Sequence, residues 1–507
     1  MWKFKTFAMT LCMAGAACAQ PEPEPDPRAD ALDAFVPRLL EATDGNVPGL
    51  SIAVVHGDDA VYLRGFGMAD VEAGVPAGPE TAFYIASSTK SFTALAAALV
   101  EADGRLDLDD SMAEHARGVT FDPTVRAPDV TLRHLLTHTH GMANHPIVVR
   151  TAFTGDHTSD ELWRLLAETR PNEDAPLGTF AYSNVGYNIF SLFLDRAAGK
   201  PWQDVLDERI FEPLGMAGTT AYASEAASSG RSVAQPYSGF GEDGRAELVY
   251  LAKQDNTMQA AGGMYTTAAD AARWLEVQLN AGRLDGRQVF PAAVIRETHE
   301  PFATTDAAFG PFTRTGYALG WYAGEYDGSG MRHHFGGFGG AHSHISFLPD
   351  EGLGVAVFVN EAGIGGNVAV TVASLAYDLW LDKEGALDRA EAFLAQVPAR
   401  VEQSRERVAA DRAERAAREW TLGRPMADYA GTYVSPSLGT MVISAESGAL
   451  RVRFGNMNAV ATPFTEPETI RVELIPDQGQ VVGFEFGASD RPDAVMYDGY
   501  RFVRTGS

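Results

Sequence analysis

Cysteine is almost absent from this chain. Among its 507 residues only Cys12 and Cys18 are cysteines, and both lie close to the N-terminus. A mature chain beginning at Gln20 would contain none, as suits a protein exported into an oxidising compartment without disulfides. This composition excludes a disulfide framework, a cysteine nucleophile and a cysteine metal site.

Positive charge is scarce as well. Lys and Arg total 40 against 67 Asp and Glu, for a formal net charge of −27. Nucleic-acid binding requires a basic surface, so the composition argues against a nucleic-acid partner. The chain has six lysines, and they are Lys3, Lys5, Lys90, Lys200, Lys253 and Lys383.

A long apolar run that could span a bilayer is also missing. Lys3 and Lys5 precede a short apolar stretch, and Ala17-Cys18-Ala19 fits the cleavage pattern of a secretory signal peptide. The stretch is too short to remain in a membrane. We therefore expect a signal peptide at 1–19 and a periplasmic or secreted protein with no stable membrane span. Lipid attachment at Cys18 is the alternative, disfavoured because Gly15 stands where such sites usually carry an apolar residue.

Composition and periodicity divide the rest of the chain into four parts. We predict a Pro/acidic spacer at 20–30, a large domain at 31–382, a charged helical linker at 383–423 and an all-β domain at 424–507. The large domain is expected to contain a helix at 31–42, a hairpin at 49–65, a helix carrying residues 87–100, mainly helical pieces from about 105 to 300, a hairpin at 342–360 and a helix at 367–381. One apolar face is expected on the first helix (Leu32, Phe35, Val36 and Leu39) and one on the second (Phe92, Leu95, Ala96 and Leu99). In the all-β domain, strands are expected at 431–434, 440–443, 449–454, 472–475, 481–486 and 501–504.

Ser87 and Lys90 form the first motif with chemical content. If this segment is a helix, the two side chains share a face, about 5–6 Å apart at Cβ. A serine hydroxyl is a weak nucleophile until a neighbour takes its proton. A lysine amine one turn away can do so if its surroundings lower its pKa from about 10.4. Alone, the pair is as readily an accident on a helix surface.

Two further motifs carry polar groups suited to the same chemistry. Tyr182-Ser183-Asn184 supplies a phenol whose pKa a lysine cation would lower, so that it could accept the serine proton. His334-Phe335-Gly336-Gly337 supplies glycines that allow close backbone approach to a ligand, and the Gly337 N–H is a candidate oxyanion donor. Taken singly, each motif is also typical of ordinary loop or turn packing.

In their order and spacing, S-x-x-K, Y-x-N and H-x-G resemble the serine β-lactamase and penicillin-binding-protein superfamily, in its class C-like branch. That branch includes class C β-lactamases, DD-carboxypeptidases, D-aminopeptidases and family VIII esterases. Segments 130–141, 260–270 and 336–343 are similar to it too, and the resemblance covers about residues 31–380. It implies an α+β fold, with an antiparallel β-sheet flanked by helices and a mainly helical subdomain. Residues 424–507 are similar to the lipocalin-like β domain appended to some of these hydrolases.

The resemblance also implies roles for the motif residues. Ser87 would be the acylated nucleophile, Lys90 its activating partner, and Tyr182 the general base and the acid toward the leaving group. The backbone N–H groups of Ser87 and Gly337 would form the oxyanion hole.

Substrate contacts are implied for Asn184, His334 and Gly336, and Asn184 would also contact Lys90. The implied function is an exported serine hydrolase that forms an acyl-enzyme with small ester, amide or short-peptide substrates, as an esterase or D-amino-acid peptidase. No cofactor is implied.

The third motif departs from the pattern of many β-lactamases. His334 stands where they have lysine, and Phe335 replaces a hydroxyl, so binding of a substrate carboxylate is weakened. Arg332 and His333 are candidates for that contact. A class C-like β-lactamase or a DD-carboxypeptidase is the alternative. A non-catalytic protein that binds cell-wall peptides is a second one, against which the intact Ser87, Lys90 and Tyr182 argue.

His138, His140 and His145 resemble the zinc string of metallo-β-lactamases, but Met142 replaces its aspartate. We therefore expect no metal. The role of the all-β domain stays open between capping the cleft and forming an oligomer.

Overall fold

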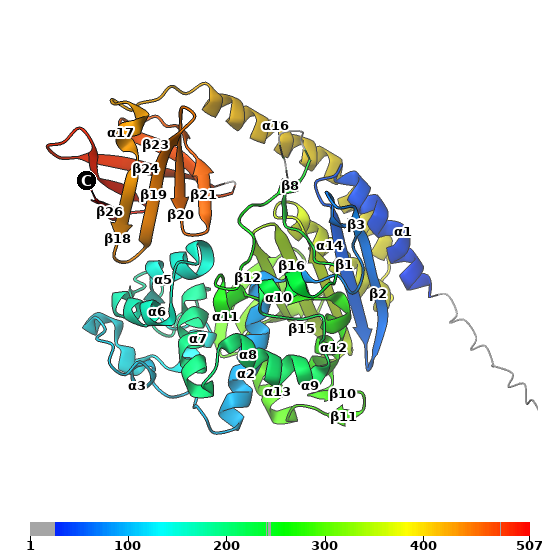
Figure 1. The fold of residues 1–507 in the computed structure, drawn as a ribbon. Helices are drawn as coiled ribbons and strands as arrows, with labels where there is room; N and C mark the ends of the chain where they lie inside the picture. The colour runs from blue at the N-terminus through cyan, green and yellow to red at the C-terminus, as the bar shows by residue number, and fades with distance from the viewer. Residues whose placement is uncertain (1–25, 240, 242–244, 477, 507) are drawn as a thin grey trace, which may run out of the picture.

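The computed structural model describes residues 26–239, 241, 245–476 and 478–506. The predicted signal peptide and residues 20–25 of the spacer lie outside these ranges. Two β-sheets, one in the body of the protein and one near the C-terminus, organise the described chain (Figure 1).

The main sheet, in the body of the protein, has nine strands, and every neighbouring pair is antiparallel. Its strand order is β12 (Ala303–Phe309), β13 (Phe312–Tyr317), β14 (Tyr322–Tyr326), β15 (Ser329–Phe338), β16 (Ala341–Leu348), β17 (Leu353–Val359), β1 (Gly49–His56), β2 (Asp59–Asp70) and β3 (Val75–Pro76). Both predicted hairpins are confirmed, as β1–β2 and β16–β17.

Helices cover both faces of this sheet. Because side chains alternate along a strand, Ile52 and Val54 of β1 pack toward α1 (Pro27–Ala42) and α14 (Gly365–Trp380). Ala53 and Val55 pack on the opposite face, toward α2 (Thr89–Ala102) and α12 (Ala268–Leu279). The central strand is therefore apolar on both sides.

The predicted apolar face of the first helix is confirmed, but the helix begins before the predicted residue 31. Its buried residues are Leu32, Phe35, Val36 and Leu39, as the periodicity indicated. The Asp26 side chain accepts the Arg28 N–H and caps a helix that begins at Pro27. Residues 27–30 thus belong to the helix and not to an extended spacer.

The second helix is more deeply buried than its pattern suggested. We expected one apolar face, yet every residue from Thr89 to Val100 is buried. An apolar helix without a polar face belongs in a core, and α2 runs between the sheet and the helical subdomain (Figure 1). Lys90 is consequently carried into the interior.

The segment between α2 and β12 is mainly helical, as predicted. Its helices are α3 (Met112–His115), α4 (Leu132–Leu136), α5 (His145–Val149), α6 (Ser159–Leu165), α7 (Asn184–Ala198), α8 (Trp202–Leu206), α9 (Glu212–Leu214), α10 (Ala223–Ser228), α11 (Gln259–Gly262), α12 and α13 (Ala292–His299). Short two-stranded ladders punctuate it: β4 (Phe83–Tyr84) with β9 (Tyr265–Thr266), β5 (Met142–Ala143) with β6 (Arg170–Pro171), β7 (Tyr237–Ser238) with β8 (Glu247–Leu248), and β10 (Arg283–Leu284) with β11 (Arg287–Gln288).

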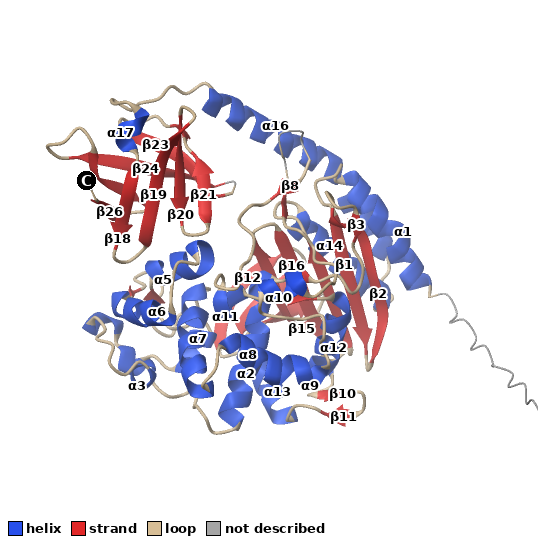
Figure 2. Ribbon diagram, in the orientation of Figure 1, coloured by secondary structure: helices blue, strands red, loops and turns tan. Residues whose placement is uncertain are grey.

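A long helix leads from the main body to the second sheet. After α15 (Ala386–Leu394), helix α16 (Val397–Ala416) passes over the molecule to α17 (Met426–Tyr429) and an all-β region (Figure 2). Its nine antiparallel strands are ordered β21 (Met457–Val460), β20 (Ala449–Phe454), β19 (Gly439–Glu446), β18 (Gly431–Ser435), β26 (Tyr500–Thr505), β25 (Pro492–Tyr497), β24 (Gln478–Phe486), β23 (Thr469–Ile475) and β22 (Thr462–Pro463). The predicted α+β class with an all-β C-terminal part is confirmed, although β21, β22 and β25 were not anticipated.

Within the described ranges no helix has the length and apolar character needed to cross a membrane.

Candidate active site

Ser87 lies in a tight turn just before α2, and not within the helix as predicted. The turn is a single 3₁₀ turn over Ala86–Ser88, and Ala86 has a φ of 44°. Left-handed backbone is costly for a residue with a Cβ and persists where the surroundings enforce it. Here Ser343 donates from Oγ to the Ile85 carbonyl at 2.6 Å, and its Oγ lies 2.8 Å from that of Ser88. Strand β16 thus holds the turn that presents Ser87.

Lys90 is fully buried and touches three polar atoms. Its Nζ lies 3.2 Å from the Ser87 Oγ, 2.8 Å from the Asn184 Oδ1 and 2.6 Å from the Ala261 carbonyl oxygen. No carboxylate forms an ion pair with it among the residues that the structure describes. Burial lowers the pKa of this amine well below its usual value.

The three oxygen contacts of Lys90 match the three N–H donors of an ammonium. They also fit a neutral amine that accepts from Ser87, and the lowered pKa favours this neutral form. An uncharged amine has two N–H donors and one lone pair. Donation to Asn184 and Ala261 uses both hydrogens, which leaves the lone pair for the hydroxyl of Ser87. The predicted contact between Asn184 and Lys90 is present.

Tyr182 stands beside this pair, immediately before α7. The Lys90 Nζ is 5.0 Å from the centre of the Tyr182 ring. Burial of the phenol raises its pKa, and its contact with Ser87 only partly offsets that effect. This direction is opposite to the one expected from a neighbouring lysine cation, because an amine whose own pKa is strongly lowered supplies no cation. The residue is nevertheless 40% exposed, so one side of its ring borders the solvent.

A buried aromatic layer supports Tyr182 from behind. The His138 ring lies 4.4 Å from the Tyr182 ring between centroids, and its Nδ1 accepts the Ser183 N–H at 3.2 Å. His138 has a φ of 59°, which makes it a second strained residue at this site. The Tyr317 ring packs 4.7 Å from that of His138. The phenol is therefore held by this packing as well as by its position just before α7.

The His-Phe-Gly-Gly motif lies within β15. His334 is buried, and its Nδ1 donates to the Phe335 carbonyl at 2.8 Å while its Nε2 accepts from the Tyr317 hydroxyl at 3.2 Å. Burial lowers the pKa of this imidazole well below its usual value, so the ring is neutral near pH 7. Both nitrogens are occupied, so a direct substrate contact by His334 stays a prediction that would require a rearrangement.

The two glycines of this motif have different surroundings. A Cβ at Gly336 would lie 2.0 Å from the Ile85 carbonyl oxygen and 2.4 Å from the Ser343 Oγ, so only glycine lets β15 pass this close to the catalytic turn. Gly337 is exposed and follows directly. Its backbone thus lies beside the turn that carries Ser87, as an oxyanion donor would require.

The three histidines that resemble a zinc-binding motif make separate local contacts and do not converge. They are His138, His140 and His145. The Nδ1 of His140 accepts the Met142 N–H at 3.0 Å, and the Nε2 of His145 lies 2.6 Å from the Asp498 carboxylate. The Nδ1 of His138 accepts the Ser183 N–H, as described above. In the described part of the chain, no group of three or more His, Cys, Asp or Glu side chains is arranged to hold a metal ion.

Arg332 and His333 are not free to bind a carboxylate: Arg332 is bonded elsewhere, and His333 is buried against Tyr322. Arg332 donates from Nε to the His299 carbonyl at 2.7 Å, and both ring nitrogens of His333 are buried without a hydrogen-bond partner. Arg314 instead stacks on Tyr322, its guanidinium carbon 3.8 Å from the ring centre. Tyr322 in turn stacks on Tyr182 at 6.1 Å between centroids. No motif marked Arg314, because only the register of β13 and β14 brings it here.

Known proteins resemble this chain in sequence and in fold. A protein-family model described as Beta-lactamase matches residues 32–377. The chain is 28% identical over 337 residues to "Unguisins hydrolase ungD'" of Aspergillus campestris, covering 62% of this chain and 59% of that protein. It is 24% identical over 321 residues to "Protein flp" of Staphylococcus aureus, covering 62% and 60%. The chain thus spans about 60% of the length of these curated relatives.

Solved structures share the fold at lower identity. An octameric penicillin-binding protein homologue from Pyrococcus abyssi superposes with a TM-score of 0.59 at 22% identity, over 94% of this chain and 99% of that one. The D-amino acid amidase from Ochrobactrum anthropi SV3 superposes with a TM-score of 0.57 at 24% identity, over 71% and 99%. The archaeal likeness extends beyond the main sheet into the C-terminal one.

Proposed function

The chain belongs to the Beta-lactamase family, and on that premise we propose that it is a serine hydrolase that cleaves ester or amide bonds through an acyl-enzyme on Ser87. One observation carries the proposal. The fully buried amine of Lys90 has its pKa lowered and lies 3.2 Å from the Ser87 Oγ. In the neutral form that this pKa favours, Asn184 and Ala261 can accept its two hydrogens, and the lone pair is free to face Ser87. That is the arrangement of a base ready to receive a serine proton.

In the proposed reaction, Ser87 Oγ forms a bond to the scissile carbonyl carbon and gives its proton to the Lys90 amine. The backbone N–H groups of Ser87 and Gly337 stabilise the resulting oxyanion. When the carbon–oxygen or carbon–nitrogen bond breaks, Tyr182 protonates the leaving group and Lys90 returns its proton to the phenolate. Water then hydrolyses the acyl-enzyme by the same route in reverse. The raised pKa of Tyr182 suits a phenol that donates.

Uncharged or singly charged small esters, amides and short peptides are the substrates that the site suits best. The engaged nitrogens of His334 argue against strong binding of a β-lactam carboxylate. Arg314 favours a D-amino-acid peptidase as the second candidate, because a guanidinium on this aromatic layer would bind a peptide carboxylate. The name of the bacterial D-amino acid amidase points the same way, and that of the fungal relative supports a hydrolase in general. Export to the periplasm or beyond, and an oligomer through the C-terminal sheet, complete the proposal.

Labelling with a fluorophosphonate tests the central claim. The folded wild-type enzyme should gain one label, located at Ser87 by peptide mass spectrometry, and S87A should neither be labelled nor turn over any substrate. Side-by-side assays of a p-nitrophenyl ester, a D-alanine amide and nitrocefin then separate esterase, peptidase and β-lactamase activity. Full activity in S87A would refute the proposal.

A further inference from the structure

A large cavity lies at the far end of β15, between the two sheets. Its volume is about 680 Å³, which falls within the range of small-molecule sites of about 300–1,000 Å³. Gly337 and the Gly339–Gly340 turn border it on the side of the main sheet. Its apolar lining includes Phe153, Val249, Leu251 and Phe338 of the main body, Val408 of α16 and Ile475 of β23. The polar side chains of His342, Arg407 and Gln478 border it as well.

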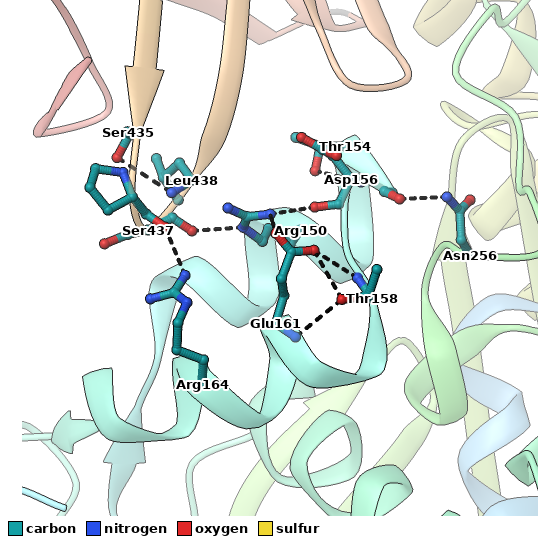
Figure 3. A network of polar contacts seen from close by, with 12 residues as sticks. Arg150, Thr154, Asp156, Thr158, Glu161, Arg164, Asn256, Ser435, Ser437 and Leu438 are labelled. Carbon is teal, nitrogen blue, oxygen red and sulfur yellow. Dashed lines mark hydrogen bonds and ion pairs between the residues drawn. The ribbon is translucent and has the colours of Figure 1, made fainter. Parts of the chain in front are cut away.

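The turn between β18 and β19 of the C-terminal sheet is hydrogen-bonded to the main body. Figure 3 shows Arg150, whose Nε donates to the Ser437 carbonyl at 2.7 Å and whose Nη1 donates to the Asp156 carbonyl at 2.5 Å. Nearby, Arg164 donates to the Pro436 carbonyl at 2.7 Å. Arg150 is only 3% exposed, so removing its guanidinium would leave the Ser437 and Asp156 carbonyls without this donor and a space in the contact.

The apolar core of the C-terminal sheet continues into the main body. Val149, Val249 and Leu251 are buried in one cluster with side chains of the C-terminal strands, and Phe153 packs against that cluster. The Phe153 ring also lies 5.8 Å from that of Phe338. A single apolar surface therefore connects the C-terminal core to the residue that follows Gly337.

The position of the cavity assigns it to one half of the substrate. In the proposed reaction the leaving group departs on the side of Tyr182, whose ring lies 6.0 Å from that of His334. Phe338 is four residues further along the same strand, about 13 Å away at the usual rise of 3.3 Å per residue. The scissile carbonyl oxygen would sit at Gly337, between these two ends. The acyl half of the substrate therefore extends toward Phe338 and the cavity.

We propose that this cavity is an acyl subsite for a bulky apolar group, and that the linker helix and the C-terminal sheet supply part of its wall. The inference rests on the proposed hydrolase function and adds a substrate class to it: esters or amides whose acyl part carries a long aliphatic or aromatic chain. A short acyl group leaves the cavity unused. The C-terminal sheet then acts as a specificity element and not only as a neighbour.

Filling the cavity from two independent elements tests the proposal in the full-length enzyme. Val408→Trp enters it from α16 and Ile475→Trp from the C-terminal sheet. The matched controls are Ala409→Trp, at the next and exposed position of α16, and Val503→Trp on β26, where the valine is 48% exposed. For each protein, kcat/KM is measured with p-nitrophenyl acetate and p-nitrophenyl octanoate, which share one leaving group, and the thermal midpoint confirms folding.

The ratio of octanoate to acetate kcat/KM should fall at least about tenfold in V408W or I475W, as loss of an apolar pocket predicts. Acetate turnover and both control variants should stay within about twofold of the wild type. Acetate turnover that depends on Ser87, with an unchanged ratio in both cavity variants, overturns the subsite and leaves the hydrolase intact. A wild-type enzyme that hydrolyses acetate but not octanoate overturns it too. No turnover dependent on Ser87 overturns the hydrolase and the subsite together.

Discussion

Replacing Lys90 by methionine should make the stability of this protein respond differently to pH. The side chain is fully buried, and burial lowers the pKa of its amine in the folded state. In the unfolded chain the amine titrates at about 10.4. Between these two pKa values the unfolded chain binds one proton more than the folded chain. By linkage, the free energy of unfolding of the wild type then rises with pH.

The expected pH slope of the free energy of unfolding follows from the one extra proton that the unfolded chain binds. Across that window the wild type should gain up to about 1.36 kcal/mol of stability per pH unit relative to K90M. Below the folded pKa, and above about 10.4, the difference between the two proteins should be constant. K90M also loses the hydrogen bonds to Asn184 and Ala261, which shifts its whole curve by an amount that does not depend on pH. The slope, and not the offset, is the test.

Urea unfolding followed by tryptophan fluorescence, repeated between pH 6 and 10, measures the difference. Most other ionisable groups are shared unchanged by the two proteins and cancel in the comparison. Lys90 also lowers the pKa of His138 and of His334, but burial is the larger cause and keeps both well below the usual value. Lys200→Met is the control, because Lys200 lies at the surface beside Glu208, and its curve should run parallel to the wild type over the same window. A K90M curve that also runs parallel to the wild type would show that the buried amine is protonated in the folded enzyme. In that case Lys90 would not be the base.

Two further substitutions follow from the same site. Tyr182→Phe should lower kcat for an amide by about 10²–10⁴-fold in steady-state assays. The loss should be much smaller for a p-nitrophenyl ester, because its leaving group needs no proton. Equal losses of kcat for both substrates would contradict the role of Tyr182 as proton donor. Gly336→Ala should lower the thermal midpoint and the activity, at a cost of about 1–3 kcal/mol or more, because its Cβ would meet the Ile85 carbonyl and the Ser343 side chain. Gly330→Ala on the same strand, where nothing lies within 4 Å of the added carbon, should be nearly neutral in the same melting experiment.

Periodicity was sufficient where a segment is amphipathic or has a polar turn. The face of α1 and both hairpins of the main sheet were predicted because their apolar residues recur with the period of the element. The turn at Ala86–Ser88 was not, since a left-handed alanine leaves no pattern in the residues around it. Its conformation is imposed by Ser343, more than 250 residues away. A helix was predicted there because the apolar residues that follow, from Phe92 to Val100, recur at helical spacing.

Burial explains why the predicted direction of the Tyr182 pKa shift was wrong. The sequence places a lysine near a tyrosine and so suggests that a cation lowers the pKa of the phenol. The structure puts Lys90 on a helix that is buried all round, where the desolvation of the amine outweighs its three polar contacts. Residue types alone do not reveal that balance, because it depends on how many apolar atoms surround the amine.

The same limit applies to the contact between the two sheets. Arg150 reads in the sequence as one of many surface charges, yet it is buried and donates to backbone carbonyls at positions 156 and 437. A carbonyl acceptor is common to every residue type, so such a contact leaves no trace in the side chains at its far end. The cavity beside Gly337 is formed by this docking, since two of its three walls belong to different sheets. Any specificity that the cavity confers therefore depends on the relative placement of the sheets, and substitutions at Arg150 should alter it without touching a substrate.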